Sequence, residues 1–249
     1  MSSRTILITG SSRGIGRAAA LMAGARGWSV GVNYRADRAS AEAVVAAVEA
    51  SGGAAVALPG DVASEDDVIA MFEGASRALG PLDGVVVNAG IVAPRARLVD
   101  MSAERMRRVF EVNVLGAYLC AREAARRLST SLGGSGGSIV LISSAASRLG
   151  SPDLYVDYAG SKGAIDTLTL GLSKELGREG VRVNAIRPGL IDTDIHASGG
   201  EPDRARTLGA TAPMGRPGTA AEIAEAIIWL LSDSSSYANG AIIDVAGGR

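Results

Sequence analysis

The chain has 249 residues, of which 47% are hydrophobic and 20% charged, with a formal net charge of −1 and a pI of about 5.9. This length favours one large α/β domain over residues 1–249 rather than two small ones. The balanced charge disfavours nucleic acid or another polyanion as a partner. No apolar run approaches the roughly 18 residues of a membrane span, and the chain begins without a signal-peptide pattern, so we expect no membrane partner.

One cysteine, Cys120, and one histidine, His196, limit the redox and metal chemistry of the chain. A single cysteine allows no intramolecular disulfide, which suits a reducing cytoplasm. We interpret Cys120 as a small core residue. A lone histidine excludes a multi-histidine metal site, so we expect no metal.

The first expected elements are a strand at 5–9, a glycine-rich turn at 10–16 and a helix at 17–26. The strand is apolar without alternation, as in parallel strands covered on both faces. Glycines let the backbone approach a pyrophosphate, and a helix N-terminus offers free N–H groups. The spacing is G-x-x-x-G-x-G, and its strand–turn–helix context favours dinucleotide binding over a plain tight turn.

The second expected strand, 28–34, ends in Asn33-Tyr34-Arg35 without an acidic residue. In such folds an acid at this point bonds the adenosine ribose, whereas arginine accommodates a 2′-phosphate. Arg13 in the glycine turn is a second candidate donor. We therefore prefer phosphate binding by Arg35 to a solvated surface charge, and predict a preference for NADP(H), with NAD(H) also possible.

Two further strands lead to candidate binding turns. A helix at 39–50 precedes a strand at 54–58, which is followed by Asp61-Val62. Ser64 caps the next helix, which reaches about residue 79, and Asp67 stands in capping-box position. A short strand at 85–87 then ends in Asn88-Ala89-Gly90, at the carboxyl edge where ligands bind in open α/β sheets.

A long helix is expected from Ser102 to about residue 128, and it contains Asn113 among apolar neighbours. Asparagine within a helix usually costs some stability. Asn113 therefore either bonds neighbouring backbone or serves a site.

After a glycine- and serine-rich loop at 132–138, a strand at 139–142 ends in Ser143-Ser144, and a helix follows from about 152 to 177. Tyr158 and Lys162 share one face of this helix. The lysine charge should lower the tyrosine pKa from about 10. Such a tyrosine can exchange a proton with a substrate oxygen, although the pattern alone also fits a packed ring beside a solvated amine.

The last third of the chain begins with a strand at 182–186 that ends in Arg187-Pro188-Gly189. Residues 190–218 show little periodicity, which is typical of a substrate loop or lid. Thr219 caps the following helix, with Glu222 completing a capping box. A final strand occupies 241–245.

Strands and helices alternate throughout, which predicts an α/β fold: a Rossmann-type doubly wound parallel sheet of about seven strands with helices on both faces. Right-handed crossovers then bring the ends of the first, fourth, fifth and sixth strands to one edge. The candidate motifs all lie at these ends.

Together and in this order, the motifs resemble those of the short-chain dehydrogenase/reductase family in its single-domain form, over nearly the whole chain. They are Thr9-Gly10-x-x-x-Gly14-x-Gly16, Asp61-Val62, Asn88-Ala89-Gly90, Asn113, Ser144, Tyr158-x-x-x-Lys162 and Pro188-Gly189 with Thr193. The resemblance implies an NAD(P)(H)-dependent oxidoreductase that interconverts a carbonyl and a secondary alcohol.

The resemblance also implies a role for each motif residue. Tyr158 is the acid or base at the substrate oxygen, and Ser144 orients that oxygen. Lys162 holds the nicotinamide ribose and tunes Tyr158, while Asn113 positions a relay water. The expected cofactor contacts are Gly10, Ser12, Arg13, Gly14, Ile15, Gly16, Tyr34, Arg35, Asp61, Val62, Asn88, Ala89, Gly90, Tyr158, Lys162, Pro188, Gly189, Ile191 and Thr193.

One spacing departs from the family pattern. Ser144 precedes Tyr158 by one residue more than is common, so Ser143 is the competing candidate. An extra residue near 151–153 would absorb the difference. We assign the role to Ser144, the second serine of the I-S-S pattern.

The substrate is the least constrained part of the prediction. The loop from Ser129 to Ser138 has no lysine or arginine to meet an acidic carrier protein. We therefore favour a small molecule such as a sugar, alcohol or ketone, with 3-oxoacyl-carrier-protein reduction as the alternative. A catalytically silent dinucleotide sensor or scaffold is the alternative of another class. The resemblance implies a homotetramer built through the two long helices and the last strand.

Overall fold

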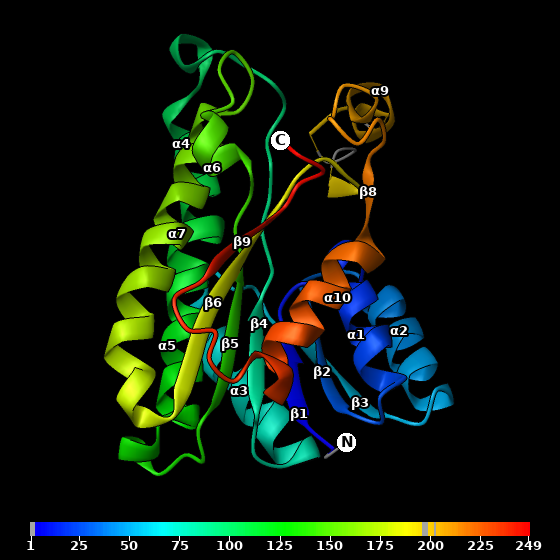
Figure 1. Cartoon of the computed structure of the whole chain (residues 1–249), viewed down its shortest axis with the longest axis vertical. Helices are drawn as coiled ribbons and strands as arrows, with labels where there is room; N and C mark the ends of the chain where they lie inside the picture. The colour runs from blue at the N-terminus through cyan, green and yellow to red at the C-terminus, as the bar shows by residue number, and fades with distance from the viewer. Residues whose placement is uncertain (1–2, 196–198, 202) are drawn as a thin grey trace.

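The computed structural model describes residues 3–195, 199–201 and 203–249. Within them, seven parallel strands form one sheet in the order β3-β2-β1-β4-β5-β6-β9 (Figure 1). The strands are β1 (Thr5–Ile8), β2 (Ser29–Tyr34), β3 (Ala54–Pro59), β4 (Gly84–Val87), β5 (Gly137–Ile142), β6 (Val181–Pro188) and β9 (Ile242–Val245). The doubly wound parallel sheet predicted from the sequence is confirmed.

Helices cover both faces of this sheet (Figure 1). One face carries α1 (Gly14–Gly24), α2 (Arg38–Ala50) and α10 (Ala220–Leu231), and the other carries α3 (Glu65–Leu79), α4 (Ala103–Phe110), α5 (Gly116–Leu128) and α7 (Val156–Leu176). Alternate residues of β1 point to opposite faces. Ile6 and Ile8 therefore join the core beneath α1 and α10, while Leu7 joins Phe72 in the core beneath α3 and α5.

Side-chain caps fix the start of several helices, as predicted from the sequence. Thr219 and Glu222 form the expected capping box at α10. Ser64 caps α3 by accepting from the Asp67 N–H. In a full capping box the Asp67 carboxylate would in turn accept from the Ser64 N–H, but here it has another partner. The Asp67 carboxylate accepts instead from the backbone N–H of Asp61 at 2.9 Å. Asp67 therefore holds the turn after β3 in place.

The long helix expected from Ser102 to residue 128 is interrupted. A π-helical turn, Glu111–Leu115, separates α4 from α5 and contains Asn113. Single π-helical turns inside α-helices are often functional, and they change the direction in which one side chain points. The prediction of one continuous α-helix was wrong at this turn.

The helix that bears Tyr158 begins at Val156 rather than near residue 152. A short helix, α6 (Ala146–Leu149), fills part of the preceding connection. Ser151 and Asp153 adopt left-handed backbone conformations, with φ of 47° and 60°. Non-glycine residues rarely do so, and the two lie in the 151–153 stretch where we expected an extra residue.

Residues 190–218, expected to be irregular, contain short regular elements. They are β7 (Ile191–Asp192), α9 (Arg204–Gly209) and the start of β8 (Gly218–Thr219), and β7 pairs with β8. This excursion stands beyond the carboxyl end of β6, near the C-terminus (Figure 1). His196 lies outside the described residues. Among the helices of those residues, none has both the length and the apolar character needed to cross a membrane.

The reactivity of the Cys120 thiol reports how tightly the core beneath α5 is packed. Its side chain is fully buried, and burial, together with the nearby Glu123 charge, raises its pKa to about 12. Because the thiolate is the reactive form, we expect the native protein to react with iodoacetamide at pH 8 at least ~10²-fold more slowly than the urea-unfolded chain. Mass spectrometry follows the modification. Equal rates in the two states would show that the packing around α5 opens readily.

Candidate active site

A continuous cleft runs along the carboxyl edge of the sheet. One part lies over the glycine turn and the ends of β2 and β3, and the other lies over the ends of β5 and β6 beside Tyr158. The two parts share the lining residues Ile15, Asn88, Gly90, Thr193 and Ile195. The two parts therefore adjoin, so an elongated ligand could reach from one into the other.

The glycine turn is held from β2 by Asn33, whose side chain is 2% exposed. Its Oδ1 accepts from the Gly10 N–H at 2.9 Å, and its Nδ2 donates to the carbonyls of Leu58 and Gly60, both at 3.1 Å. Asn33 thus joins the turn to the ends of two strands. We did not identify it as a site residue from the sequence, although a buried asparagine at the end of an apolar strand is a usable signal.

The Asn88-Ala89-Gly90 turn is joined to the same glycine turn. Asn88 Nδ2 donates to the carbonyls of Thr9 at 2.8 Å and Gly10 at 3.0 Å. A Cβ at Gly16 would lie 2.7 Å from that Nδ2 and from the Gly10 oxygen. Gly16 therefore permits close helix–strand packing and, contrary to our expectation of a cofactor contact, does not line the cleft.

The N-terminus of α1 opens toward the cleft. Arg13 occupies its N-cap position without capping the helix through its side chain, and Gly10 and Gly14 adopt left-handed backbone conformations with φ of 62° and 56°. A Cβ at Gly14 would meet only Thr193, at 3.7 Å. Uncapped N–H groups at a helix N-terminus form a ready anion site, so this turn fits a pyrophosphate.

Asp61 forms ion pairs with two arginines at the far end of the cleft. Its Oδ2 lies 3.2 Å from Arg108 Nη2 and 3.8 Å from Arg35 Nη1. Burial raises the Asp61 pKa, but the Ala63 N–H, the Arg108 hydrogen bond and the two arginine charges outweigh it, so the net pKa is lowered. Arg108, on α4, is a cleft residue that we did not identify from the sequence.

A carboxylate also lies at this end of the cleft, beyond the positions expected from the sequence. Asp37 lines the cleft, and its oxygens accept from the Ser40 N–H at 2.9 Å and the Ser40 hydroxyl at 2.6 Å. These bonds lower its pKa, with a smaller contribution from the Arg13 charge. Asp37 is therefore engaged as the N-cap of α2.

At the other end of the cleft, the structure separates the two candidate serines. Ser144 is half-buried, accepts from the Ala146 N–H at 3.1 Å and donates to the Tyr158 oxygen. Ser143 is buried, and its hydroxyl bonds Asp166 at 2.6 Å and the Lys162 carbonyl at 3.2 Å. Of the two, Ser144 is the serine that lies beside the tyrosine.

Lys162 is 5% exposed, and its Nζ donates to the carbonyl of Ile142 at 2.8 Å. The Nζ lies 5.7 Å from the centre of the Tyr158 ring. Burial lowers the Lys162 pKa to about 8, and Asp166 opposes this shift.

We expected the lysine charge to lower the Tyr158 pKa, and this was wrong for the site as it stands. Burial raises the pKa of Tyr158, and the opposing effect comes from the Ser144 hydrogen bond. The lysine binds a backbone carbonyl rather than the phenol, so its charge is directed away from the tyrosine oxygen.

Asn113 bonds neighbouring backbone, one of the two alternatives the sequence left open. Its Oδ1 accepts from the Ile91 N–H at 2.8 Å, and its Nδ2 donates to the Ile91 carbonyl at 2.9 Å and to Ser161 Oγ at 3.1 Å. It does not line the cleft, but a Cβ at Gly90 would lie 3.4 Å from its Oδ1 and 3.5 Å from Lys162 Nζ. Asn113 thus holds the turn that faces the lysine.

The remaining residues predicted as cofactor contacts line the cleft. They are Gly10, Ser12, Arg13, Gly14, Ile15, Tyr34, Arg35, Asp61, Val62, Asn88, Ala89, Gly90, Tyr158, Lys162, Pro188, Gly189, Ile191 and Thr193.

A contact that we did not predict closes the outer wall of the cleft. The Tyr155 hydroxyl donates to Glu201 Oε2 at 2.6 Å, and Glu201 also pairs with Arg204 at 2.9 Å and Arg95 at 3.6 Å. This cluster ties the excursion after β6 to the connections after β4 and β5.

Known proteins resemble this chain along almost its full length. A family sequence model described as Enoyl-(Acyl carrier protein) reductase matches residues 10–249. The chain is 51% identical over 243 residues to a protein of Escherichia coli (strain K12) named uncharacterized oxidoreductase YgfF, with 98% of each chain covered. It is 35% identical over 246 residues to L-rhamnose 1-dehydrogenase (NAD(P)(+)) of Sphingomonas sp. (strain SKA58), covering 98% of this chain and 95% of that one.

A solved structure has the same fold. The crystal structure of 3-ketoacyl-(acyl-carrier-protein) reductase from Brucella melitensis complexed with NADH matches with a TM-score of 0.91 at 30% identity, covering 99% of this chain and 98% of that one. The strand order, the motifs at the carboxyl edge and these full-length matches agree. The chain belongs to the short-chain dehydrogenase/reductase family of oxidoreductases.

Proposed function

We propose that the chain interconverts a carbonyl and a secondary alcohol of a small molecule with a preference for NADP(H), and that Tyr158 exchanges the proton at the substrate oxygen. The observation that carries the proposal is the group at the end of β5. There a half-buried tyrosine accepts a hydrogen bond from Ser144, and Lys162 is held one helical turn away.

The cleft fits a dinucleotide because its two ends have complementary chemistry. The glycine turn offers an uncapped helix N-terminus to a pyrophosphate. The absence of a side chain at Gly90 leaves room beside Lys162 for ribose hydroxyls. When bound, the nicotinamide supplies the hydride chemistry, and the protein contributes positioning and electrostatics.

In the reducing direction, Tyr158 donates its proton to the substrate oxygen, and in the oxidising direction it accepts one. Burial raises its pKa, so the phenol holds its proton at neutral pH until a partner draws it away. Ser144 accepts from the Ala146 N–H and donates its proton to the Tyr158 oxygen, so a substrate oxygen placed beside both groups can take over that donated bond. We propose that Lys162 binds the ribose and that Asn113 orders a relay water beside it.

The proposed preference for NADP(H) rests on positive charge near the adenosine end. Arg35 is 61% exposed there, and Arg108 lies on the opposite side of Asp61. A 2′-phosphate can compete with the Asp61 carboxylate for both guanidinium groups, because both are charge-assisted acceptors. Arg13, at the N-cap of α1, is a third donor that lines this part of the cleft.

The loop that we used to disfavour an acidic carrier protein lies far from the cleft. The loop from Ser129 to Ser138 lies at the amino end of β5, opposite the cleft, where Gly137 bonds the carbonyl of Gly180 at 3.0 Å. Its lack of basic residues therefore says nothing about substrate. The arginines near the cleft mouth are instead paired with acids, Arg95 with Glu201 and Arg97 with Asp153 at 3.5 Å.

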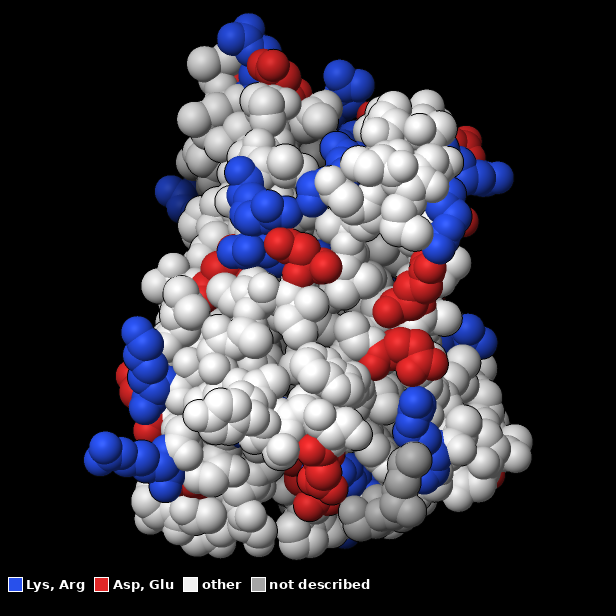
Figure 2. Space-filling model, in the orientation of Figure 1, with Lys and Arg blue, Asp and Glu red and all other residues white. Residues whose placement is uncertain are grey.

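Charges of both signs are also interspersed over the face drawn in Figure 2. Paired arginines offer less attraction to an acidic carrier than unpaired ones. The cleft beside Tyr158 carries apolar side chains from Val92, Leu149 and Leu190. These features favour a small ketone or alcohol with an apolar body, with 3-oxoacyl-carrier-protein reduction as the second candidate.

We further propose that the protein is a cytoplasmic homotetramer, consisting of a single domain with residues 190–218 as its substrate loop. Partly exposed apolar side chains on the α4, α5 and α7 side support a self-association surface there. Five of these side chains are each 41–54% exposed: Leu98, Phe110, Leu115, Tyr118 and Leu170.

Tyr158→Phe tests the proposed proton donor. The change removes one hydroxyl and keeps the ring, so we expect kcat to fall at least ~10²-fold, the low end of acid–base effects, while dinucleotide binding persists. Steady-state turnover of a panel of carbonyls and alcohols, with dinucleotide fluorescence titration as the control, checks both. Near-normal turnover by this variant would refute the assignment, and a silent wild-type protein would favour the sensor alternative.

Asn113→Ala tests the relay role against a structural one. Loss of the two Ile91 bonds should lower the free energy of unfolding by about 1–3 kcal/mol, and loss of the relay should slow turnover with dinucleotide affinity within a few-fold. Ser161→Ala is the matched control, because it removes the third Asn113 contact and the Ser161 bond to the Tyr158 backbone carbonyl but keeps both Ile91 bonds. Urea unfolding and kcat are measured for both. A destabilised Asn113→Ala enzyme with wild-type kcat would leave Asn113 a structural residue only.

Arg35→Ala tests cofactor preference. One charge-assisted hydrogen bond contributes roughly 1.5–3 kcal/mol, so KM for NADPH should rise at least ~10-fold while KM for NADH stays nearly constant. Arg38→Ala is the control, because Arg38 pairs with Glu42 and does not line the cleft. Unchanged KM values for both cofactors after Arg35→Ala would show that Arg35 is a solvated surface charge.

A further inference from the structure

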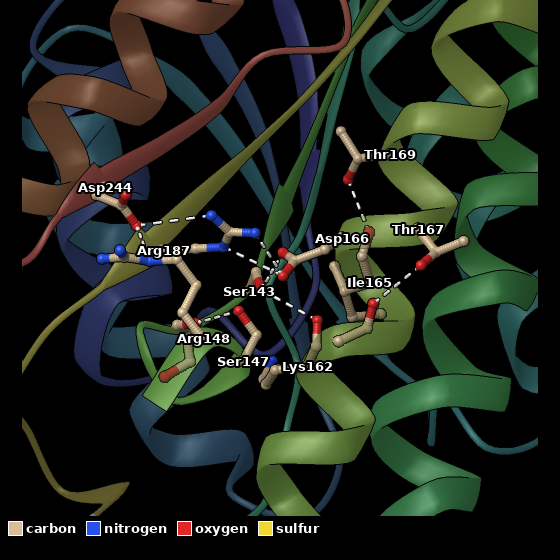
Figure 3. A network of polar contacts seen from close by, with 12 residues as sticks. Ser143, Ser147, Arg148, Lys162, Ile165, Asp166, Thr167, Thr169, Arg187 and Asp244 are labelled. Carbon is tan, nitrogen blue, oxygen red and sulfur yellow. Dashed lines mark hydrogen bonds and ion pairs between the residues drawn. The ribbon is translucent and has the colours of Figure 1, made fainter. Parts of the chain in front are cut away.

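A buried polar network lies behind the Tyr158 site, between α7, β5 and β6 (Figure 3). Its centre is Asp166, which stands on α7 one turn after Lys162 and is 9% exposed. Ser143 Oγ donates to Asp166 Oδ1 at 2.6 Å. Arg187 donates to Asp166 Oδ2 through Nε at 3.1 Å and Nη2 at 2.8 Å. This carboxylate therefore accepts three hydrogen bonds from two neighbouring strands.

The network reaches the site through three consecutive residues at the end of β5. The Ile142 carbonyl accepts from Lys162 Nζ, the Ser143 hydroxyl bonds Asp166, and the Ser144 hydroxyl meets the Tyr158 oxygen. Because the three residues are adjacent, fixing the middle one restricts the directions of the other two. The Ser143–Asp166 contact, at 2.6 Å, is shorter than the Lys162–Ile142 contact, at 2.8 Å, and both of its residues are buried.

Arg187 supports the carboxylate from β6. Its side chain is 17% exposed, and its Nη1 lies 3.9 Å from Asp244 on β9. Asp244 also pairs with Arg148 at 3.4 Å, so the network ends at a partly exposed outer layer. Asp244 is 38% exposed, and its ion pairs are with Arg187 and Arg148, neither of which lies on α7, so it is a suitable comparison for Asp166.

We propose that Asp166 is a positioning residue for the chemistry at Tyr158: its carboxylate fixes the end of β5 through Ser143 and stands one helical turn from Lys162. The proposal rests on the proposed function of Tyr158 and Lys162. Asp166 lies outside the sequence motifs at the carboxyl edge of the sheet.

Asp166 is the carboxylate among the residues around the Lys162 amine. On α7, Tyr158 and Asp166 stand one helical turn before and after the lysine. On β5, the Ile142 carbonyl accepts from its amine. The turn after β4 and the π-helical turn contribute Gly90 and Asn113, which are uncharged. Arg187 of β6 stands behind the Asp166 carboxylate. Burial lowers the Lys162 pKa to about 8, and Asp166 raises it against this effect. Removing the carboxylate should lower the Lys162 pKa further, because a nearby negative charge favours the protonated amine.

The sequence offers a direct measurement, because it contains only two lysines, Lys162 and Lys174. Protein labelled with ¹³C at lysine Cε should give two titrating NMR signals, and the exposed Lys174 serves as an internal reference. In Asp166→Asn we expect the Lys162 midpoint to fall by about one pH unit or more. In Asp244→Asn we expect it to stay at the wild-type value, with Lys174 unchanged throughout.

Turnover supplies the second readout. If charged Lys162 is needed for carbonyl reduction, activity is lost as pH rises through its pKa, so the alkaline limb should move to lower pH in Asp166→Asn and stay in place in Asp244→Asn. We also expect kcat at neutral pH to fall about tenfold in Asp166→Asn, with KM for the dinucleotide within a few-fold. Should the single variant fail to fold because Arg187 loses its partner, Asp166→Asn/Arg187→Gln removes both charges and should show a smaller fall of the Lys162 midpoint, because the more distant Arg187 cation is lost as well.

Equal Lys162 midpoints in wild type, Asp166→Asn and the double variant would overturn the proposal, whatever the activities. A shifted midpoint with an unmoved rate profile would overturn the catalytic part of it. A wild-type protein that turns over no carbonyl or alcohol would contradict the proposed function, whereas a Lys162 shift measured in that same protein would still support the electrostatic role of Asp166.

Discussion

The position of the end of β5 relative to α7 is the constraint on which the rest of the site depends. Parallel strands expose only their carboxyl ends to a ligand edge, so side chains from different elements must meet there. Here Ile142, Ser143 and Ser144 contact Lys162, Asp166 and Tyr158 of α7 in turn. A shift of one residue between strand and helix would exchange Ser143 with Ser144 and place the wrong hydroxyl beside the phenol.

The same principle operates at the other end of the cleft through asparagines. Asn33 and Asn88 bond backbone groups of the glycine turn, which lies outside the regular hydrogen bonding of the sheet and of α1. A side-chain amide has both donors and an acceptor, so it can replace the missing backbone partners. Buried backbone groups without partners would be costly. The turn is therefore open toward the cleft and fully braced behind it.

The sheet and most of the site could be predicted because their signals are local. Apolar runs predict parallel strands, Thr219 and Glu222 predict a helix start, and the Tyr158–Lys162 spacing predicts a shared face. The π-helical turn at Asn113 and the left-handed Ser151 could not be predicted, since both depend on packing against α7 and the cleft. Arg108 was missed for a related reason: a helix surface arginine becomes a cleft residue only when α4 is placed beside Asp61.

The spacing of Tyr158 and Lys162 in the sequence does not predict the direction of the Tyr158 pKa shift. Two residues one helical turn apart share a face, but the direction of each polar atom is set by its nearest partner. The Lys162 amine is turned to the Ile142 carbonyl, and burial then dominates both groups, raising the tyrosine pKa and lowering the lysine pKa. Both shifts favour the neutral forms, so burial, rather than the spacing of the two residues along α7, decides the direction in which each pKa moves.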